Sequence, residues 1–471
     1  MREADTGPPE DAAGFRDSLG IVSREGKRKW IYPKKIVGRF YRYRTVLSIL
    51  LLAVLLGTPF LRINGHPFIL FNVVERKFIL FGQIFGPHDF YLIGLALITL
   101  VVFVILFTVA FGRLFCGWVC PQTVFMEMVF RRIDYWMEGD HKQQQRLNES
   151  SWKGEKVVRK GAKYLISFAL SFLIANMLLA YIIGTDGLFR IITDPPLLHV
   201  GGLTAALAFS ALFYWIFVWF REQACILVCP YGRLQGVLLD RSSIVIAYDH
   251  KRGEPRGRIR RGEEQTIGDC IDCDQCVEVC PTGIDIRNGT QLECVNCTAC
   301  IDACDMVMDK TGRPRGLVRY DSADGITSGT RRRWTPRVIC YAVVLTVLSV
   351  FLLYLLSIRT DLDVTILRTP GMFYQEQPAE RISNVYDFKV LNKTFDRTPV
   401  TLKLVEPAGE LQLMGDRLMV DPQTTTEGKL LVLLPRAEIR SINTPLRIGV
   451  YKGETQIDLI STSFLGPAQK P

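Results

Sequence analysis

Residues 270–304 hold eight of the thirteen cysteines, in two runs that repeat one spacing. Each run has gaps of two, two and three residues between its four cysteines, and a proline follows the first run. The runs consist of Cys270, Cys273, Cys276 and Cys280, and of Cys294, Cys297, Cys300 and Cys304. This spacing is typical of bacterial ferredoxins with two [4Fe–4S] clusters, in which the fourth ligand of each cluster comes from the other run.

The ferredoxin pattern assigns four cysteines to each cluster. Zinc sites use pairs of cysteines two residues apart, but rarely three at such gaps with a fourth three residues later. Four disulfides would require an oxidising compartment. Two clusters are therefore the favoured interpretation, and they indicate electron transfer without naming the acceptor. One cluster is expected on Cys270, Cys273, Cys276 and Cys304, and the other on Cys294, Cys297, Cys300 and Cys280.

Four further cysteines form two shorter motifs, each directly after a long apolar stretch. Cys116 and Cys120 are separated by three residues and followed by proline, and Cys225 and Cys229 repeat this arrangement. The match indicates an internal duplication. The three-residue gap places two thiols on one face of a helix. The proline that follows moves the second cysteine out of helical geometry.

Two such pairs on neighbouring helices would bring four sulfur atoms together. Soft thiolates favour Cu(I), zinc or an iron–sulfur cluster over hard cations, and a pair of thiols can also cycle with a disulfide. The alternative is that these cysteines are small apolar packing residues, which is our interpretation of the isolated Cys340. Two matching motifs favour chemistry, but their spacing leaves the ligand open.

The elements that carry these motifs are expected to cross a membrane. The chain is 48% hydrophobic, and five stretches are long and apolar enough to span a bilayer. A further stretch, 67–85, is interrupted by Glu75, Arg76 and Lys77, so we expect an interfacial or re-entrant segment there in preference to a sixth span. The five expected spans are about 45–61, 90–111, 164–183, 200–220 and 337–358.

The net charge of +10 is distributed unevenly around these spans. Basic residues precede the first span, occur throughout the loop between the second and third spans, and precede the fifth span. The loop 184–198, by contrast, contains one basic residue, Arg190. The positive-inside rule then predicts a cytoplasmic N-terminus and an external C-terminus. We expect these charges to set the topology and to contact anionic lipid, and no basic soluble domain suggests nucleic-acid binding. The basic residues concerned include Arg44, Arg113, Arg131, Lys156, Lys160 and Arg331 to Arg333.

The same pattern predicts a multi-domain membrane protein with an α-helical bundle, a ferredoxin module and a β-sandwich. Residues 1–30 are polar and lack the apolar core of a signal peptide. Short runs with β-branched residues after residue 360 predict an antiparallel, immunoglobulin-like sandwich that docks a partner or steadies the assembly. The expected divisions are a cytoplasmic tail at 1–44, transmembrane helices at 45–230, a cytoplasmic ferredoxin domain at 231–330, a last transmembrane helix at 331–359 and a periplasmic domain at 360–471.

This order of features resembles the CcoG family of cytochrome c oxidase accessory proteins, also called FixG or RdxA. The resemblance covers nearly the whole chain and includes the stretch 384–394 of the tail. Membrane polyferredoxins of the NapH and NosR kind are similar in the motifs and the ferredoxin insert but lack this tail. The resemblance implies a multi-pass protein of the bacterial inner membrane that supports assembly of cbb3-type oxidase and reduces Cu(II) to Cu(I) in the cytoplasm.

The resemblance also implies roles for particular residues and partners. Cys116, Cys120, Cys225 and Cys229 would handle copper, and the ferredoxin cysteines would supply them with electrons. The implied partners are copper transporters and chaperones and oxidase assembly factors, besides the lipid bilayer. The electron donor and a homodimer stay open. Two other functions also stay open, namely a quinol-linked electron carrier to a partner reductase and a non-catalytic assembly scaffold.

Overall fold

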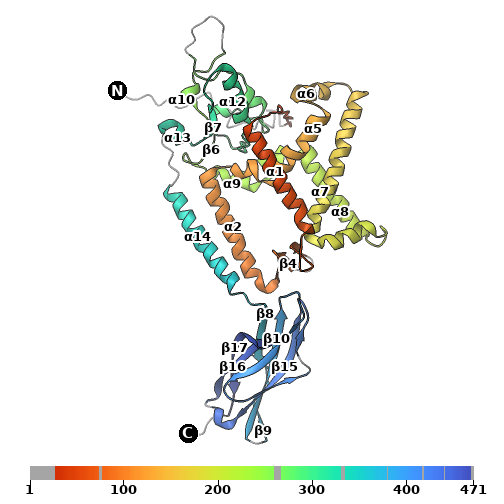
Figure 1. Cartoon of the computed structure of the whole chain (residues 1–471), viewed down its shortest axis with the longest axis vertical. Helices are drawn as coiled ribbons and strands as arrows, with labels where there is room; N and C mark the ends of the chain where they lie inside the picture. The colour runs from red at the N-terminus through yellow and green to blue at the C-terminus, as the bar shows by residue number, and fades with distance from the viewer. Residues whose placement is uncertain are drawn as a thin grey trace. The chain divides into compact units, whose positions relative to one another are not determined.

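A computed structural model of the chain describes residues 27–73, 77–258, 267–329, 335–378, 380–415, 418–439 and 441–467 (Figure 1). Most of the polar N-terminal stretch and the charges of Glu75, Arg76 and Arg331 to Arg333 lie outside these residues. The chain forms two compact units. One comprises residues 1–72 and 94–350, and the other comprises residues 73–93 and 351–471.

Five helices in the described part of the chain are long and apolar enough to cross a membrane, which confirms the predicted number of spans. The third, α7, contains a break at Gly184, where φ is 78°; glycine adopts this backbone conformation without steric cost. The fourth continues from α8 into a π-helical segment, η5. The bounds are α1 (Arg39–Gly57), α2 (Phe90–Phe111), α7 (Glu155–Thr193), α8 (Val200–Tyr214) with η5 (Trp215–Phe220), and α14 (Pro336–Ser357).

The stretch 67–85 is not one of these helices. It forms short strands, of which β2 (His66–Pro67) and β3 (Ile69–Asn72) belong to the first unit. In the second unit, β4 (Lys77–Leu80) pairs antiparallel with β5 (Gln83–Phe85). The described residues of this stretch therefore give no support to a sixth helical span.

Short helices follow the second and fourth spans and carry the paired cysteine motifs. Their apolar core contains Phe125, Phe130, Ile174, Phe213 and Phe217, and the rings of Phe130 and Phe217 stack with centroids 5.4 Å apart. After the second span come α3 (Leu114–Trp118), α4 (Pro121–Thr123), the π-helical η4 (Val124–Phe130), α5 (Arg131–Met137) and α6 (His141–Glu149); after the fourth come the π-helical η6 (Ala224–Val228) and α9 (Pro230–Leu238).

The ferredoxin module lies between two paired strands. Strand β6 (Val245–Tyr248) pairs antiparallel with β7 (Val318–Asp321), so the start and the end of the module lie side by side. Ile246, Met308 and Leu317 form part of its buried core. The helices of the module are α10 (His250–Gly253), α11 (Gln275–Glu278), the 3-10 turn η7 (Ile286–Asn288) and α12 (Ala299–Thr311), and α13 (Ala323–Ser328) follows β7.

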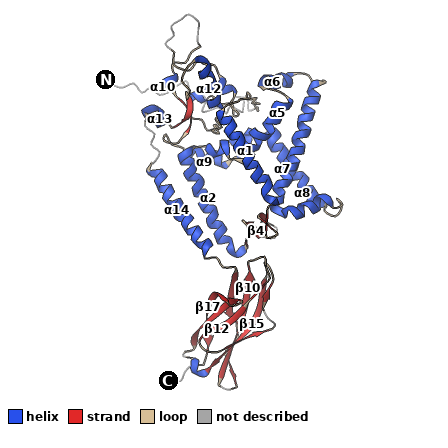
Figure 2. Ribbon diagram, in the orientation of Figure 1, coloured by secondary structure: helices blue, strands red, loops and turns tan. Residues whose placement is uncertain are grey.

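The second unit contains the predicted immunoglobulin-like sandwich (Figure 2). The runs that predict strands are 383–389, 398–405, 411–414, 429–434, 446–451 and 456–463, and a strand forms in each of them. The sequence does not predict β8, β9 or β14. Tyr386 is fully buried, and its hydroxyl donates to the Ser463 carbonyl of the other sheet at 2.9 Å. One sheet has the order β13 (Glu410–Met414), β15 (Thr425–Pro435), β10 (Arg381–Asn392) and β8 (Leu362–Arg368), with β9 (Gln375–Gln377) also paired to β10; the other has β12 (Thr401–Glu406), β16 (Asn443–Lys452) and β17 (Thr455–Leu465); β11 (Thr398–Pro399) pairs with β14 (Met419–Val420).

Several basic residues that were expected to contact lipid are instead buried, which corrects that expectation. They form hydrogen bonds with backbone carbonyls or ion pairs with carboxylates of the short helices, as in the contact between Lys160 and Glu138. Counting charges along the sequence does not reveal such partners. The buried residues are Arg44, Arg113, Arg131, Lys156 and Lys160.

Candidate functional site

The two ferredoxin runs adopt the same local backbone conformation. The residues on both sides of Cys273 are left-handed, with φ of 51° at Asp272 and 55° at Asp274. The equivalent residues around Cys297 are also left-handed, with φ of 53° at Asn296 and 67° at Thr298. Such values are uncommon outside glycine. Their repetition in both runs shows that each loop bends in the same way around its central cysteine.

The eight ferredoxin cysteines gather into two sets that match the predicted exchange of fourth ligands. Cys270, Cys273, Cys276 and Cys304 line one small cavity. The second cavity is lined by Cys280, Cys294, Cys297 and Cys300, and Cys276 reaches it as well. The two sets are therefore neighbours. Helix α12 contributes one cysteine to each set, Cys300 and Cys304, which lie one turn apart.

The chemistry of these cavities fits iron–sulfur clusters. Burial raises the pKa of Cys276 and of Cys294 to about 12 and that of Cys297 to about 11, so these thiols stay protonated at neutral pH until a metal displaces the proton. Among the described residues, no three His, Cys, Asp or Glu side chains meet closely enough for a single metal ion. The four thiolates of a [4Fe–4S] cluster lie farther apart than the ligands of a single metal ion, because each thiolate binds a different iron.

The two shorter motifs also share one geometry. Cys116 lies in α3 and Cys225 in the π-helical η6. The second cysteine of each motif leaves the helix, with φ and ψ of −57° and 123° at Cys120 and of −64° and 112° at Cys229. The following proline begins the next helix in both cases. The predicted departure from helical geometry and the internal duplication are thus visible in the backbone.

The four thiols of the two motifs lie in one neighbourhood. The pKa of Cys225 is raised to about 12, first by burial and then by the nearby thiols of Cys120, Cys116 and Cys229. Burial likewise raises the pKa of Cys116 to about 11, and Gln235 Nε2 lies 3.5 Å from its sulfur. The structure therefore brings the two motifs together, although they are about a hundred residues apart in sequence.

Two contacts join the first motif and the second span to the chain after the second motif. The buried Arg113 donates from Nη2 to the carbonyl of Gly232. The hydroxyls of Thr108 in α2 and Tyr231 in α9 are 2.7 Å apart. A side chain at Gly232 would not fit, because its Cβ would stand 2.7 Å from the carbonyl oxygen of Cys225. The second motif is thus held closely against the end of the second span.

The first motif packs directly on the second ferredoxin run. A Cβ on Gly117 would stand 2.5 Å from the carbonyl oxygen of Val295 and 2.6 Å from that of Asn296. Arg44 of α1 is buried between the two segments. It donates from Nε to the Gly117 carbonyl at 3.0 Å and from Nη1 to the Cys297 carbonyl at 2.9 Å. One side chain of the first span therefore connects the first paired motif to the second ferredoxin run.

Aromatic and apolar contacts extend this packing. Trp118 Nε1 donates to the Tyr320 hydroxyl at 3.0 Å, and that hydroxyl donates to the Asn296 carbonyl at 3.2 Å. Cys116 packs against the apolar cluster that contains Val295 and Cys297. The four-thiol site therefore adjoins the second set of ferredoxin cysteines, with little intervening protein.

Three family models match this chain. One described as a 4Fe-4S dicluster domain matches residues 220–323, and another described as a 4Fe-4S binding domain matches residues 93–139. A third, described as an IG-like fold at the C-terminal of FixG, matches residues 352–467. The matches thus cover both kinds of cysteine motif and the sandwich.

Whole-chain relatives identify the family. RdxB and RdxA of Cereibacter sphaeroides are each 36% identical, over 393 and 377 residues, which cover 78% and 77% of this chain and 80% and 79% of the relatives. The nitrogen fixation protein FixG of Rhizobium meliloti is 30% identical over 465 residues, or 87% of each chain. The chain belongs to the FixG/RdxA family. The crystal structure of a FixG-related protein from Vibrio parahaemolyticus matches 23% of this FixG/RdxA-family chain and 97% of its own, with 17% identity and a TM-score of 0.19.

This FixG/RdxA-family protein is thus a membrane iron–sulfur electron-transfer protein. The cysteines singled out in the sequence line the two cavities or lie in the four-thiol neighbourhood, but sequence reasoning missed the residues that join them. Arg44 was counted only as a charge that sets topology, and nothing in the sequence marked Gln235 or Tyr320. Gly117 did carry a signal, because it lies inside the first motif, where glycine permits close backbone approach.

Proposed function

We propose that this protein passes electrons from its ferredoxin module to the four thiols of the paired motifs, and that these thiols bind copper and reduce Cu(II) to Cu(I). The observation that carries the proposal is the packing of Cys116 and Gly117 on the second ferredoxin run, fixed by Arg44. A donor and an acceptor that share one packed interface can exchange an electron without large movement of either.

The two ferredoxin sets, Cys270, Cys273, Cys276 with Cys304 and Cys294, Cys297, Cys300 with Cys280, would each hold one [4Fe–4S] cluster. When bound, each cluster takes up and releases one electron. The thiols of Cys116 and Cys225 must lose their protons when copper binds. Soft sulfur ligands then stabilise Cu(I) more than Cu(II), which favours the gain of one electron by each copper ion.

Serine substitution of the paired cysteines tests this proposal. Serine keeps the size of the side chain but replaces a soft ligand by a hard one. The double variants C116S/C120S and C225S/C229S should each retain about eight irons per chain, the content of two [4Fe–4S] clusters. After reduction with dithionite and removal of the excess, each should lose most of its ability to reduce added Cu(II). Cys340→Ser is the matched control, because Cys340 is exposed on α14. Copper reduction at the wild-type rate in either double variant would assign these thiols to packing.

A second candidate is that the four thiols hold a further iron–sulfur cluster. It is favoured by the match of a 4Fe-4S binding model to residues 93–139, which contain Cys116 and Cys120 but neither ferredoxin run. Four thiolates would then require Cys225 and Cys229 as well. This candidate predicts about twelve irons in the wild-type chain and a loss of about four irons in each double variant.

The proposed setting is the bacterial inner membrane, with the N-terminus and the ferredoxin module in the cytoplasm and the sandwich in the periplasm. The charge bias around the spans supports this orientation. Copper transporters and chaperones would then receive Cu(I) on the cytoplasmic side, in support of cbb3-type oxidase assembly. The sandwich would dock assembly partners on the other side.

A further inference from the structure

A cavity of about 470 Å³ lies where α5, α6, α7 and η5 meet residues 30–32. Its volume is within the range of small-ligand sites. The third span begins at this cavity and the fourth ends there, so both contribute from the same membrane face. Six aromatic side chains line the cavity, namely Trp30, Tyr32, Tyr164, Tyr214, Trp215 and Trp219. Tryptophan and tyrosine are common at membrane interfaces.

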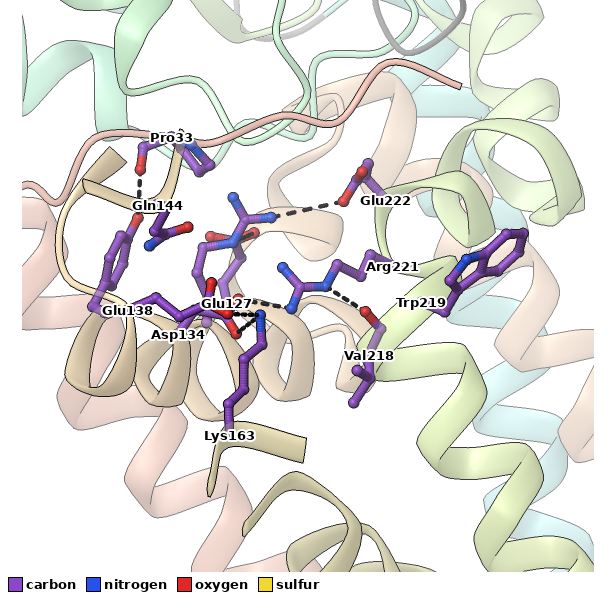
Figure 3. Close-up of polar contacts among 12 residues, drawn as sticks. Pro33, Glu127, Asp134, Glu138, Gln144, Lys163, Val218, Trp219, Arg221 and Glu222 are labelled. Atoms are coloured by element: carbon purple, nitrogen blue, oxygen red, sulfur yellow. Dashed lines mark hydrogen bonds and ion pairs between the residues drawn. The ribbon is translucent and has the colours of Figure 1, made fainter. Parts of the chain in front are cut away.

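The polar wall of this cavity consists of buried charged side chains from three elements (Figure 3). Lys163 of α7 lies 3.0 Å from Asp134 and 3.2 Å from Glu138, both of the segment at α5. Arg221, which follows η5, lies 2.7 Å from Asp134. Burial alone would raise the pKa of Asp134, but Arg221 and Lys163 hold it below its usual range. Asp134 is therefore a fixed anion that positions the two cations.

Glu138 differs from Asp134 in its hydrogen bonding. Its Oε1 atom is buried and lies 3.2 to 3.5 Å from the amino groups of Lys163 and Lys160. It nevertheless has no hydrogen-bond partner of good geometry among the residues that the structure describes. Buried polar atoms are nearly always hydrogen-bonded, so such an atom calls for an explanation. A hydroxyl group of a ligand in the cavity would supply the missing donor.

The backbone at Arg221 also marks this cavity as a functional region. Its φ of 45° and ψ of −122° are strained for a residue other than glycine. The π-helical segments η5 and η6 flank it, and π-helical turns occur frequently at functional sites. The Arg221 carbonyl accepts a hydrogen bond from Gln122 Nε2 at 3.5 Å. Gln122 follows Cys120 by two residues, and Arg221 precedes Cys225 by four. The cavity thus adjoins the four-thiol site.

We propose that this cavity binds the head group of a lipid-soluble quinol, which supplies the electrons. The flat ring would pack against Trp215 and Trp219, whose indoles stack with centroids 5.5 Å apart. One hydroxyl would donate to Glu138, and Lys163 would donate to the ring oxygen as it becomes a carbonyl. This inference rests on the proposed electron-transfer function and adds the class of donor.

The proposed reaction balances. The quinol loses two electrons and two protons and becomes a quinone, and the two electrons reduce two Cu(II) ions to Cu(I). Glu138 accepts the proton of one hydroxyl and releases it to water, and the second hydroxyl releases its proton to water directly. The charges of the cavity favour this ligand over a phospholipid head group, because Asp134 and Glu138 already pair with Lys160, Lys163 and Arg221. A phosphate would meet two carboxylates at close range.

Binding is tested on the full-length protein, purified without oxygen and reconstituted in nanodiscs. Photolysis of an azido-substituted short-chain quinone should label peptides that contain Tyr164 or Trp215, and decylubiquinone should compete for the labelling. Trp215→Leu should reduce the labelling tenfold or more. Trp136→Leu is the matched control, because Trp136 is exposed on α5 and lies outside the cavity. Labelling elsewhere, or competition by phosphatidylglycerol but not by decylubiquinone, would overturn the proposal.

Electron entry is tested in the same preparations by the loss of cluster absorbance. Decylubiquinol should reduce Trp215→Leu and Glu138→Gln at least tenfold more slowly than the wild type, whereas dithionite should bleach all variants equally. Glu155→Gln, an exposed change on α7, should behave as the wild type. Equal rates with decylubiquinol in every variant would refute the quinol site. Rapid reduction of the protein by quinol without any copper reduction would refute the proposed function and leave the quinol site standing.

Discussion

Arg44 provides a direct test of how the membrane helices hold the ferredoxin module. Its guanidinium donates to the carbonyls of Gly117 and Cys297 at 3.0 and 2.9 Å, and it is buried. Arg44→Met keeps the aliphatic stem and removes both donors. A hydrogen bond from a charged group contributes about 1.5–3 kcal/mol, so the lower end for two such bonds is about 3 kcal/mol. The contact between the motifs should weaken by that amount.

Hydrogen exchange measures this loss locally. At 1.4 kcal/mol for each factor of ten, about 3 kcal/mol corresponds to exchange that is roughly 100-fold faster. The affected amides should lie in peptides that cover residues 114–119 and 294–300. Reduction of added Cu(II) by protein that has been reduced with dithionite and freed of the excess should slow in parallel, while the iron content stays at the wild-type level.

The matched control is Arg42→Met, on the same helix but exposed. It removes the same charge from the same end of the span, so it also separates a local contact from a general effect on topology. If Arg44→Met and Arg42→Met have the same exchange rates and the same copper reduction, then Arg44 does not join the two motifs. The route from the ferredoxin module to the four thiols would then lie elsewhere.

Three further outcomes follow from the structure. Gly117→Ala places its Cβ 2.5 Å from the Val295 carbonyl oxygen, so overpacking should destabilise this contact by about 1–3 kcal/mol and speed hydrogen exchange there. Gly161→Ala is the control, because a Cβ at Gly161 has open space around it, and it should leave hydrogen exchange unchanged. A phosphatase fused after residue 471 should be active in the periplasm and a fluorescent protein fused there should be dark; the reverse pattern would refute the orientation. The pKa of Asp134 is lowered in the folded protein, so this residue contributes stability that is present above its unfolded pKa of about 3.9 and is lost as the pH falls through the folded value. The thermal unfolding temperature should therefore decrease once the pH is below about 4. Asp134→Asn should flatten this pH dependence.

The sequence predicted the spans and the sandwich because their signals are local. Apolar length specifies a membrane helix, and alternating β-branched residues specify strands such as β10 and β15. The strands β8, β9 and β14 were not predicted. The short stretch 67–85 was harder, because its apolar residues fit a strand as well as an interfacial segment, and periodicity alone does not separate these.

The ferredoxin cysteines were predictable in kind because metal ligation imposes a fixed spacing, and the two cavities gather the same two sets of four. The joining residues were not predictable. Arg44 and Cys297 are 253 positions apart, and the sequence holds no local sign that one would donate to the other. The acidic partners of the buried cations, such as Asp134 and Glu138, became recognisable only when three separate helices were placed around one cavity.

The pairing of β6 with β7 has a consequence for how this protein arose and how it is built. Because Val245 lies opposite Asp321, the polypeptide enters and leaves the iron-binding part at one point, as inserted domains commonly do. Such a part can be gained, lost or exchanged as a cassette without changing the order in which the surrounding helices are threaded into the bilayer. Cells could therefore insert the helices first and load the cassette with iron and sulfide afterwards.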